Sequence, residues 1–413
     1  MKNWGGNIDI GPARVSRPES LEELRRIVAA SEHVRVLGAR HSFTGILTTA
    51  GGYVQLDGLP KAVDIDTAAG TATVTAGMRY ADVATALHRA GYALANLASL
   101  PDITVAGACA TATHGSGDTQ QGLAGAVTGM QLVDPQGDVV DLRRDVDLDT
   151  FAGSVVSLGA LGVAVRMTLA IEPTFDVAQS VQVAAPLDEV RDRFDEVYGA
   201  AYSVSVFTKW ADDANIWLKR RTDRPVVDLE LGTRALSRLN PVPGSDPAVC
   251  SPQLGVPGPW HERLPHVRAG AIAPVGDELQ SEYFLPRAAA PAAFTALREI
   301  GELLGPVLHI GEVRTVRGDD LWLSPAYERD SVAFHFTWKK GTPHLMPVIA
   351  AVEERLVPLG ARPHWAKLTT LAGAEIRSGY RRAADFQELR EKFDPQGKFG
   401  NDFVDELFST GSL

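Results

Sequence analysis

Small side chains fill an unbroken run of the sequence, residues 103–117, and this run constrains the fold more than any other feature. It reads ITVAGACATATHGSG. Side chains of this size cannot build a thick core by themselves, but they can pack closely around something large and flat. The residues that offer backbone amides and hydroxyl groups are Gly107, Gly115, Gly117, Thr104, Thr111 and Thr113. An internal layer of small residues between two sheets explains the run equally well, so both interpretations stay open.

Length and charge limit the class of protein. A chain of 413 residues exceeds one ordinary core of about 100–200 residues, so we expect two domains. The net charge of −11 disfavours binding to nucleic acid or to an anionic membrane. No stretch free of Asp, Glu, Lys and Arg is longer than 16 residues, which is too short for a membrane helix. The first residues hold no apolar core of a secretory signal. We therefore expect a cytoplasmic protein, and a monomer.

Hydrophobic periodicity and turn residues predict a mixture of helices and strands. Ser20 and Glu23 form a capping box before apolar residues at helical spacing, which predicts a helix over 20–31. The apolar run 34–37 ends at Gly38 and predicts a strand. Further strands are predicted at 53–56, 62–66, 71–76, 127–133, 138–142, 163–171, 177–183, 203–208, 279–285, 307–316 and 331–338. Further helices are predicted at 80–90, 290–304, 343–357 and 384–393, and a long surface loop at 223–262. The predicted class is α+β.

Several common cofactor and catalytic motifs are missing from the sequence. It contains no G-x-G-x-x-G after a predicted strand, no Walker A loop, no G-x-S-x-G and no H-E-x-x-H. Nicotinamide-dependent Rossmann enzymes, P-loop nucleotide hydrolases and α/β-hydrolases are therefore disfavoured. Cys109 and Cys250 are the two cysteines, and alone they form neither a disulfide framework nor a structural zinc site.

A turn that carries a histidine, Gly38-Ala-Arg-His-Ser-Phe43, follows the first apolar strand. Small residues there let the backbone approach a ligand, and consecutive turn amides can bind an anion. His41 would present a nucleophilic imidazole on this turn. A surface turn with a solvated histidine explains the same residues, and a packed, hydrogen-bonded side chain explains His114. Neither histidine decides the function by itself.

Polar side chains recur on one face of three segments that are predicted to be extended. The pairs, each two residues apart, are Glu312 and Arg314, His335 and Thr337, and Lys367 and Thr369. Residues two apart share one face of a strand. Glu312 and His335 stand between large apolar residues, which indicates burial, and buried polar groups need partners or a ligand. Such a face suits a neutral polyhydroxylated ligand, although a solvent-facing strand surface is the alternative for each pair.

Together these segments resemble one known family. The matching motifs are Gly38-Ala-Arg-His-Ser42, His114-Gly-Ser-Gly117, Ser157-Leu-Gly-Ala-Leu-Gly162, Pro363-His-Trp-Ala-Lys367 and Asp394-Pro-Gln-Gly-Lys-Phe399. They are similar to motifs of the vanillyl-alcohol-oxidase-type flavoproteins, and within these to the aldonolactone oxidase branch. The resemblance covers almost the whole chain and includes 96–101, 256–265 and 323–327. Matches of this length in order are far more specific than any one motif.

The resemblance implies a two-domain vanillyl-alcohol-oxidase-type FAD fold. The FAD-binding domain would comprise 1–172, completed by 369–413, and a substrate-binding (cap) domain with an antiparallel sheet would comprise 173–368. His41 matches the histidine that is bonded covalently to the flavin 8α-methyl group, and turn amides would hold the pyrophosphate. The other positions that match FAD contacts are Val36, Leu37, Gly38, Ala39, Arg40, Ser42, Ser99, Thr104, Gly107, Thr111, Ala112, Thr113, His114, Gly115, Gly159, Gly162 and Val165.

The resemblance also implies a reaction. The enzyme would oxidise a terminal primary alcohol of an alditol, of the xylitol or sorbitol type, to the aldehyde, with hydride passing to flavin N5 and O2 reduced to H2O2. The positions that match substrate contacts are Ser99, Glu312, Arg314, His335, Thr337 and Lys367. Arg314 and Lys367 are the candidate catalytic residues, because two cations would stabilise an oxygen that loses its proton. Ala98 matches a position that controls access of O2.

Other functions stay open at this stage. The same fold could serve an aldonolactone oxidase or a flavin dehydrogenase, and the polar face could belong to a non-enzymatic sugar-binding protein. A metal hydrolase would use His261, Glu262 and His266, but these lie in a Pro-rich loop without helical spacing. Asp118 departs from the apolar residue that the resemblance leads us to expect. It would affect substrate preference if it faces the site and nothing if it faces solvent.

Overall fold

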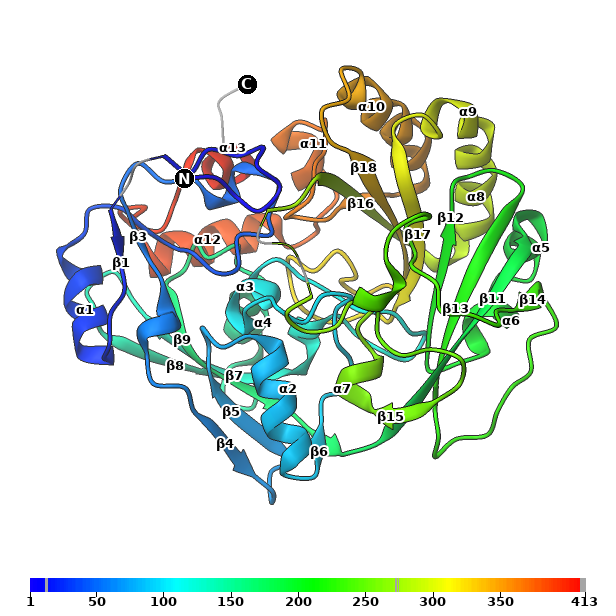
Figure 1. Cartoon of the computed structure of the whole chain (residues 1–413). Helices are drawn as coiled ribbons and strands as arrows, with labels where there is room; N and C mark the ends of the chain where they lie inside the picture. Colours follow the sequence, from blue (N-terminus) through cyan, green and yellow to red (C-terminus); the bar gives the residue numbers. More distant parts are fainter. Residues whose placement is uncertain (12–13, 272, 274, 409–413) are drawn as a thin grey trace.

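Two antiparallel sheets, one in each half of the ribbon in Figure 1, organise the chain. The structure is a computed structural model that describes residues 1–11, 14–271, 273 and 275–408. The smaller sheet has the order β4-β5-β9-β7-β8. Its strands are β4 Val63–Asp66, β5 Thr71–Thr75, β7 Val127–Val133, β8 Val139–Arg143 and β9 Val163–Ala170. Beside it lie the parallel strands β1 Val15–Ser16, β3 Gly52–Val54 and β2 Val34–Val36, and the pair β6 Tyr92–Ala93 and β10 Glu172–Pro173.

The larger sheet has nine strands among the described residues, in the order β14-β11-β13-β12-β17-β18-β16-β19, with β15 paired to β11. The strands are β11 Asp176–Pro186, β12 Ser203–Thr208, β13 Asp213–Arg221, β14 Thr233–Arg234, β15 Pro257–Pro259, β16 Glu278–Pro286, β17 Leu308–Val316, β18 Ser331–Lys339 and β19 Arg362–Pro363. Their pairing brings Glu312, His335 and Glu282 into one row across β17, β18 and β16. The three side chains therefore project from the same face of the sheet.

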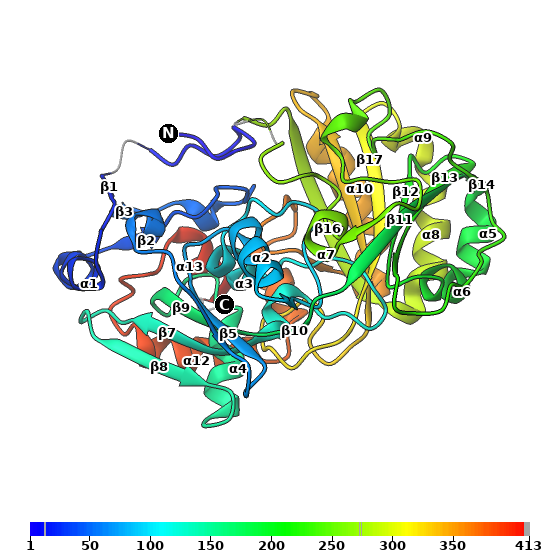
Figure 2. The ribbon, with the colours of Figure 1, turned by 60° about the horizontal axis from the view of Figure 1, so that its bottom comes forward.

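Helices cover the opposite, outer face of the larger sheet, as Figure 2 shows for α8 and α9. These helices are α5 Leu187–Asp192, α6 Phe194–Gly199, α8 Ala290–Glu299, α9 Gly301–Leu304 and α10 Leu345–Leu356. The short helix α7 Trp260–Arg263 is not among them, because Trp260 belongs to the core of the other half. On β18 the side chains of Val332, Phe334, Phe336 and Trp338 all join the core under these helices. The strand is apolar on one face and polar on the other, as its alternation predicts.

The two ends of the chain lie together, so that the red C-terminal helices stand among the blue N-terminal elements in Figure 1. The helices of this half are α1 Leu21–Ala30, α2 Tyr80–Arg89, α3 Val105–Ala110, α4 Leu148–Val155, α11 Gly373–Ser378, α12 Ala383–Phe393 and α13 Asp402–Phe408. Lys398 donates to the carbonyls of Val28 and Pro135, at 2.9 and 2.6 Å. Asn401 donates to the carbonyl of Gly45 at 3.0 Å. The exact boundaries of the two predicted domains stay a prediction.

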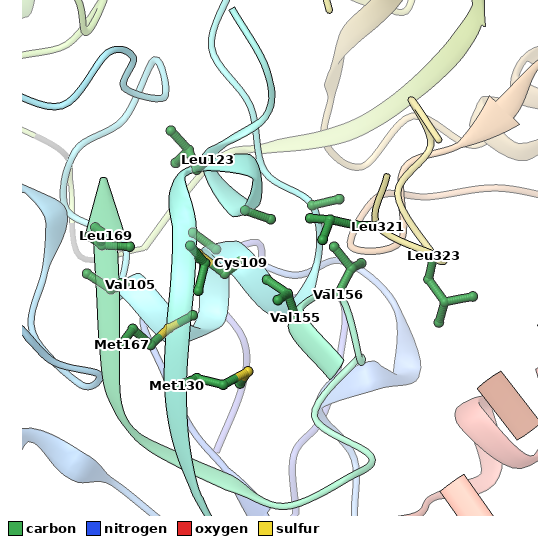
Figure 3. Packing of buried hydrophobic residues seen from close by; sticks show 14 of the residues in the cluster. Val105, Cys109, Leu123, Met130, Val155, Val156, Met167, Leu169, Leu321 and Leu323 are labelled. Carbon is green, nitrogen blue, oxygen red and sulfur yellow. The ribbon is translucent and has the colours of Figure 1, made fainter. Parts of the chain in front are cut away.

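The small-residue run combines its two interpretations, since part of it forms the short helix α3. One side of α3 places Val105 and Cys109 in the core, beside Met130 and Met167 of the smaller sheet (Figure 3). The other side, with Gly107 and Thr111, lines a large cavity. Small residues therefore allow a thin helix to stand between a core and a cavity.

Most predicted elements are present, and the differences have local causes. The capping box is confirmed in part: Ser20 Oγ accepts from the amide of Glu23, but the Glu23 carboxylate accepts from Glu19. Residues 364–369 are not a strand, because β19 ends at Pro363 and Lys367 closes a turn onto the His364 carbonyl. The strand β13 has no predicted counterpart. The 223–262 loop also differs from prediction, since its middle packs on the sheet and lines the cavity.

Candidate active site

A cavity of about 670 Å³ lies between the glycine turn after β2 and the polar face of the larger sheet. This volume is in the range of pockets that hold small molecules and cofactors. One wall comes from residues 35–42, 98–114 and 157–162, and the other from β16, β17, β18 and the turn at 364–367. Elements from both halves of the chain therefore build one site.

The glycine turn forms the first wall with its backbone. Gly38 lies so close to Thr104 that a Cβ atom there would be 2.6 Å from the Thr104 hydroxyl oxygen, so no larger residue fits without a shift. Arg40 has a φ of 61°, a left-handed conformation that is uncommon for a side chain with a Cβ. Leu158, at 54°, shares this conformation in the second loop of the wall. Strained backbone of this kind concentrates at functional sites.

His41 faces the cavity from this turn, and its imidazole packs against the indole of Trp4 with ring centroids 4.8 Å apart. Burial lowers the pKa of His41 to about 4, with a further contribution from the positive charges of Lys367 and Arg79. The imidazole is therefore neutral at physiological pH. A neutral imidazole has a free lone pair, which is the form that acts as a nucleophile.

Arg35, a residue that was not predicted from the sequence, also lines the cavity on the side of the glycine turn. Its side chain is buried, with 6% exposed. Its guanidinium donates to four carbonyls, those of Phe399, Ile46, Leu158 and Gly159, at 2.6, 2.7, 2.8 and 3.3 Å. No carboxylate of the described residues forms an ion pair with it. A buried cation without a counter-ion is costly, so this position suits an anionic ligand. A charged residue inside the apolar run 34–37 is the sequence signal that could have identified it.

The second wall is the polar face of the larger sheet, and Glu282 of β16 is its centre. Its carboxylate accepts from Arg314 Nη2 at 2.5 Å and lies 3.1 Å from His114 Nε2. The other oxygen lies 3.5 Å from His335 Nδ1 and 3.9 Å from Lys367 Nζ. Sequence reasoning missed Glu282, although an acidic residue in the apolar strand 279–285 was a visible signal.

The charges of this wall shift one another's pKa values. The pKa of the Glu282 carboxyl is well below its usual value, because the cations and histidines around it outweigh its burial. Burial lowers the pKa of Lys367 to about 8, with Arg314 contributing in the same direction and Glu282 opposing it. Burial and the charge of Lys367 lower the pKa of His335 to about 4. At neutral pH the wall therefore holds an ionised glutamate, an arginine and a neutral histidine. It also holds Lys367, whose pKa of about 8 lies close to neutral pH.

The structure brings nearly all predicted site residues together around this cavity. All six predicted substrate contacts line it, and Arg314 Nη1 of the sheet lies 3.4 Å from Ser99 Oγ of the other wall. Ala98 lines it as well. Ala112, Gly115 and Val165 lie behind its walls, in the core or against Asn96, and do not line it.

Asp118 does not line the large cavity. It forms a salt bridge with Arg287, with Oδ1 2.6 Å from Nη1, at the edge of a separate small pocket. Neither of its two anticipated environments describes it fully, because the carboxylate is paired with Arg287 and not simply exposed to solvent.

The proposed metal trio does not converge. The His261 ring packs on His88, whereas His266 Nε2 lies 3.1 Å from Glu312 Oε1. The described ranges hold no group of three side chains placed to bind a metal ion. Nor does any helix within them have the length and apolar character that a bilayer span requires.

Comparisons with known proteins agree with this geometry. Residues 12–143 match the family described as FAD binding domain, and residues 277–407 match that of D-arabinono-1,4-lactone oxidase. An alditol oxidase from a Streptomyces species is 46% identical over 98% of this chain and 98% of its own. The chain belongs to the alditol oxidase family. It is therefore an FAD-dependent oxidoreductase, and the sugar-binding and metal-hydrolase alternatives lose their support.

More distant proteins are also similar to this chain over nearly its whole length. The L-gulonolactone oxidase of Bos taurus is 26% identical over 99% of this chain and 98% of its own. Among solved structures, cholesterol oxidase from B. sterolicum superposes with a TM-score of 0.77 over 98% of this chain and 96% of that one, at 14% identity. That likeness confirms the predicted vanillyl-alcohol-oxidase-type α+β fold.

Proposed function

We propose that this protein oxidises a terminal primary alcohol of an alditol, such as xylitol or sorbitol, to the aldehyde and reduces O2 to H2O2. The observation that carries the proposal is the buried polar face, where two carboxylates, an arginine, a histidine and a lysine converge on one cavity. A neutral polyol needs many donors and acceptors and little net charge. The similarity to the Streptomyces protein named alditol oxidase supports the same substrate class.

The residues of the first wall fit FAD. The uncompensated charge of Arg35 suits a pyrophosphate, and Gly38 and Gly107 leave a cradle that a Cβ would fill, at 2.6 and 2.7 Å from the Thr104 hydroxyl. We propose that the predicted FAD contacts around the cavity hold the cofactor and that His41 bonds to it covalently. When bound, FAD would supply the acceptor for hydride from the substrate carbon and the route of the electrons to O2. In this proposal residues 1–172 and 369–413 hold the cofactor, and 173–368 hold the substrate together with Ser99.

The second wall stabilises charge on the reacting oxygen. An alcohol that loses hydride from carbon also loses its hydroxyl proton, so negative charge develops on that oxygen. Arg314 and Lys367 are the cations that face it, and such preorganised charges act most strongly in a dry site. Because the pKa of Lys367 is about 8, a substantial fraction of Nζ is neutral at pH 7–8 and can accept the proton. Glu282 orients both cations, and Ser99, Glu312, His335 and Thr337 bind the hydroxyl groups.

An aldonolactone oxidase is the second candidate, favoured by the match of residues 277–407 to the D-arabinono-1,4-lactone oxidase family. A lactone offers fewer hydroxyl groups than an alditol of the same length. The density of polar side chains on β16, β17 and β18 therefore favours the alditol.

Oxygen consumption over a panel of substrates tests the proposal. We expect glycerol, xylitol, sorbitol and mannitol to include the best substrates and gulonolactone to be poor, with H2O2 formed in step. Turnover of the lactone alone would contradict the alditol assignment. Electron transfer to an artificial acceptor without O2 consumption would instead identify a dehydrogenase.

The covalent bond has its own test. Acid-precipitated wild-type protein should stay yellow and carry the extra mass of the flavin, whereas His41→Ala should release its flavin into the supernatant. A denatured wild-type chain without added mass would refute the role of His41. Size-exclusion chromatography of the same sample tests the expected monomer.

A further inference from the structure

One buried histidine of the cavity lining, which is not among the predicted substrate contacts, contacts two of them at once. His266 lies in the loop 264–267, directly after α7, and is 5% exposed. Its Nε2 is 3.1 Å from Glu312 Oε1. Its backbone amide donates to the carbonyl of Ser99 at 3.0 Å, and the next amide, that of Val267, donates to the same oxygen at 3.1 Å. The two contacts join β17 of the larger sheet to the segment that carries Ser99.

The ring of His266 is fixed by its surroundings. Phe207 of β12 and Trp217 of β13 both meet it edge-on, with ring centroids 5.2 and 5.4 Å apart. Ser205 Oγ is the second group within hydrogen-bonding distance of Nε2, at 3.1 Å. Aromatic rings on two sides leave the imidazole one orientation, which is the condition for holding a partner accurately.

The main chain of the loop is held equally firmly. Lys219 of β13 donates through its buried Nζ to the carbonyl of Leu264. Ser251 donates through Oγ to the carbonyl of Pro265 at 2.7 Å, and its amide donates to the carbonyl of His266 at 2.9 Å. A support built from buried, satisfied hydrogen bonds is rigid. The loop therefore holds both Glu312 and the carbonyl of Ser99 in fixed positions.

The chemistry of the contact identifies the proton on Nε2. The Glu312 carboxylate is ionised, since its pKa lies well below the usual value under the influence of Arg314 and His266. Burial lowers the pKa of His266 to about 4, so the ring is neutral. A carboxylate only accepts, so Nε2 donates and Nδ1 carries no proton. Nδ1 has no hydrogen-bond partner in the described part of the chain. The side chain thus makes its directional contact through one atom.

We propose that His266 is a positioning residue for the substrate: it fixes the Glu312 carboxylate and, through its backbone, Ser99, and so sets the spacing between two groups that bind hydroxyls of one polyol. Lys219 and Ser205 support it from β13 and β12. The inference rests on the proposed function, because it assigns Glu312 and Ser99 to the substrate. His266 itself lines the cavity, and the inference assigns it a positioning role and no part in the oxidation.

Anaerobic flavin reduction by xylitol, followed at several concentrations, separates binding from chemistry. His266→Leu keeps the volume and loses the donor, and we expect the dissociation constant to rise about tenfold or more, as for a lost hydrogen bond to a charged group. The saturating reduction rate should stay within about threefold of wild type, since only uniform binding is lost. His266→Gln places an amide N–H near the original Nε2 and should restore binding. His261→Leu, from the same part of the chain, is the matched control and should behave as wild type.

A double-mutant cycle completes the test. If His266 acts through Glu312, the combined His266→Leu and Glu312→Gln variant should bind no worse than Glu312→Gln alone. Additive losses, equal defects in His266→Leu and His266→Gln, or unchanged binding in His266→Leu would each overturn the inference. The unfolding temperature of each flavin-containing variant gives a readout independent of turnover, and it should fall no further in His266→Leu than in His266→Gln. A wild-type enzyme that no alditol reduces would instead refute the proposed function, and with it this inference.

Discussion

The two walls of the cavity are built in opposite ways. The wall around Gly38 and Gly159 approaches its ligand largely with backbone and small side chains, and Arg35 and His41 are larger side chains that line it. The wall on β16, β17 and β18 reaches into the cavity with long charged side chains from a regular sheet. The first wall would bind the cofactor through its shape, and the second would recognise a small polar substrate through charge and hydrogen bonds.

This difference predicts how each wall fails. Addition of atoms should damage the backbone wall, because a Cβ has no room there. Removal of charge should damage the sheet wall, because each buried charge depends on its partners.

Loss of either cation from the sheet wall should have the largest effect. We expect Arg314→Leu and Lys367→Met each to slow anaerobic flavin reduction at saturating alditol by roughly 100-fold or more, as the loss of a preorganised charge-stabilising donor does. The flavin content should stay unchanged, because neither residue belongs to the backbone wall. Lys209→Met removes an exposed lysine and serves as the control. Saturating rates within a few-fold of wild type would show that the two cations only bind the substrate.

Arg35 is the exception that sharpens the contrast, as a charged side chain within the backbone wall. In a His41→Ala background, where FAD can dissociate, we expect Arg35→Gln to weaken FAD binding about tenfold or more, as for a lost charged contact. Riboflavin has no pyrophosphate, so its affinity should hardly change. Arg35→Lys keeps the charge and should retain part of the affinity. Equal losses for both flavins would indicate that Arg35 only ties the carbonyls of its loops together.

A methyl group added to the backbone wall tests the other half of the contrast. The Cβ of Gly38→Ala would lie 2.6 Å from the Thr104 hydroxyl. In the same His41→Ala background we expect FAD binding about tenfold weaker, in line with typical costs of overpacking. Gly199→Ala is the control, since a Cβ there has nothing within 4 Å. Flavin absorbance per chain in the purified proteins measures the effect. Full flavin content in Gly38→Ala would show that the turn can shift without cost.

Sequence reasoning predicted the two walls unequally. Alternation along β17 and β18 identified Glu312, Arg314, His335 and Thr337, because a strand places every second residue on one face. Glu282 escaped it, since its importance arises only when β16 pairs with β18 and the row across the sheet forms. Lys367 lines the cavity, but the predicted strand that was to present it is a turn. The contacts of the His266 ring come from side chains of β12 and β13, which become neighbours only when these strands pair. Because β13 has no predicted counterpart, these contacts could not be predicted from the sequence.

The FAD contacts came from the resemblance to a family and not from periodicity. A wall formed by backbone shows no alternation of polar and apolar residues that sequence reasoning could detect. Glycines with positive φ also occur in ordinary turns elsewhere in the chain, as at Gly137 and Gly360, so a glycine alone does not identify the wall. What distinguishes Gly38 is its distance to Thr104, which lies 66 positions away in the sequence. Such a contact exists only after folding.

Ala98 stands where the two walls meet, and it gives the smallest expected effect. It lines the cavity beside Ser99 and is 5% exposed. If its small side chain keeps a path open for O2, Ala98→Val should slow reoxidation of the reduced flavin several-fold while reduction by alditol changes less. Ala106→Val makes the same change on α3 in the same cavity, and it should leave reoxidation unaffected. Stopped-flow measurement of both half-reactions decides the matter: equal slowing of the two in Ala98→Val, or equal slowing of reoxidation in both variants, would mean that added bulk disturbs the cavity generally and that no oxygen path runs past Ala98.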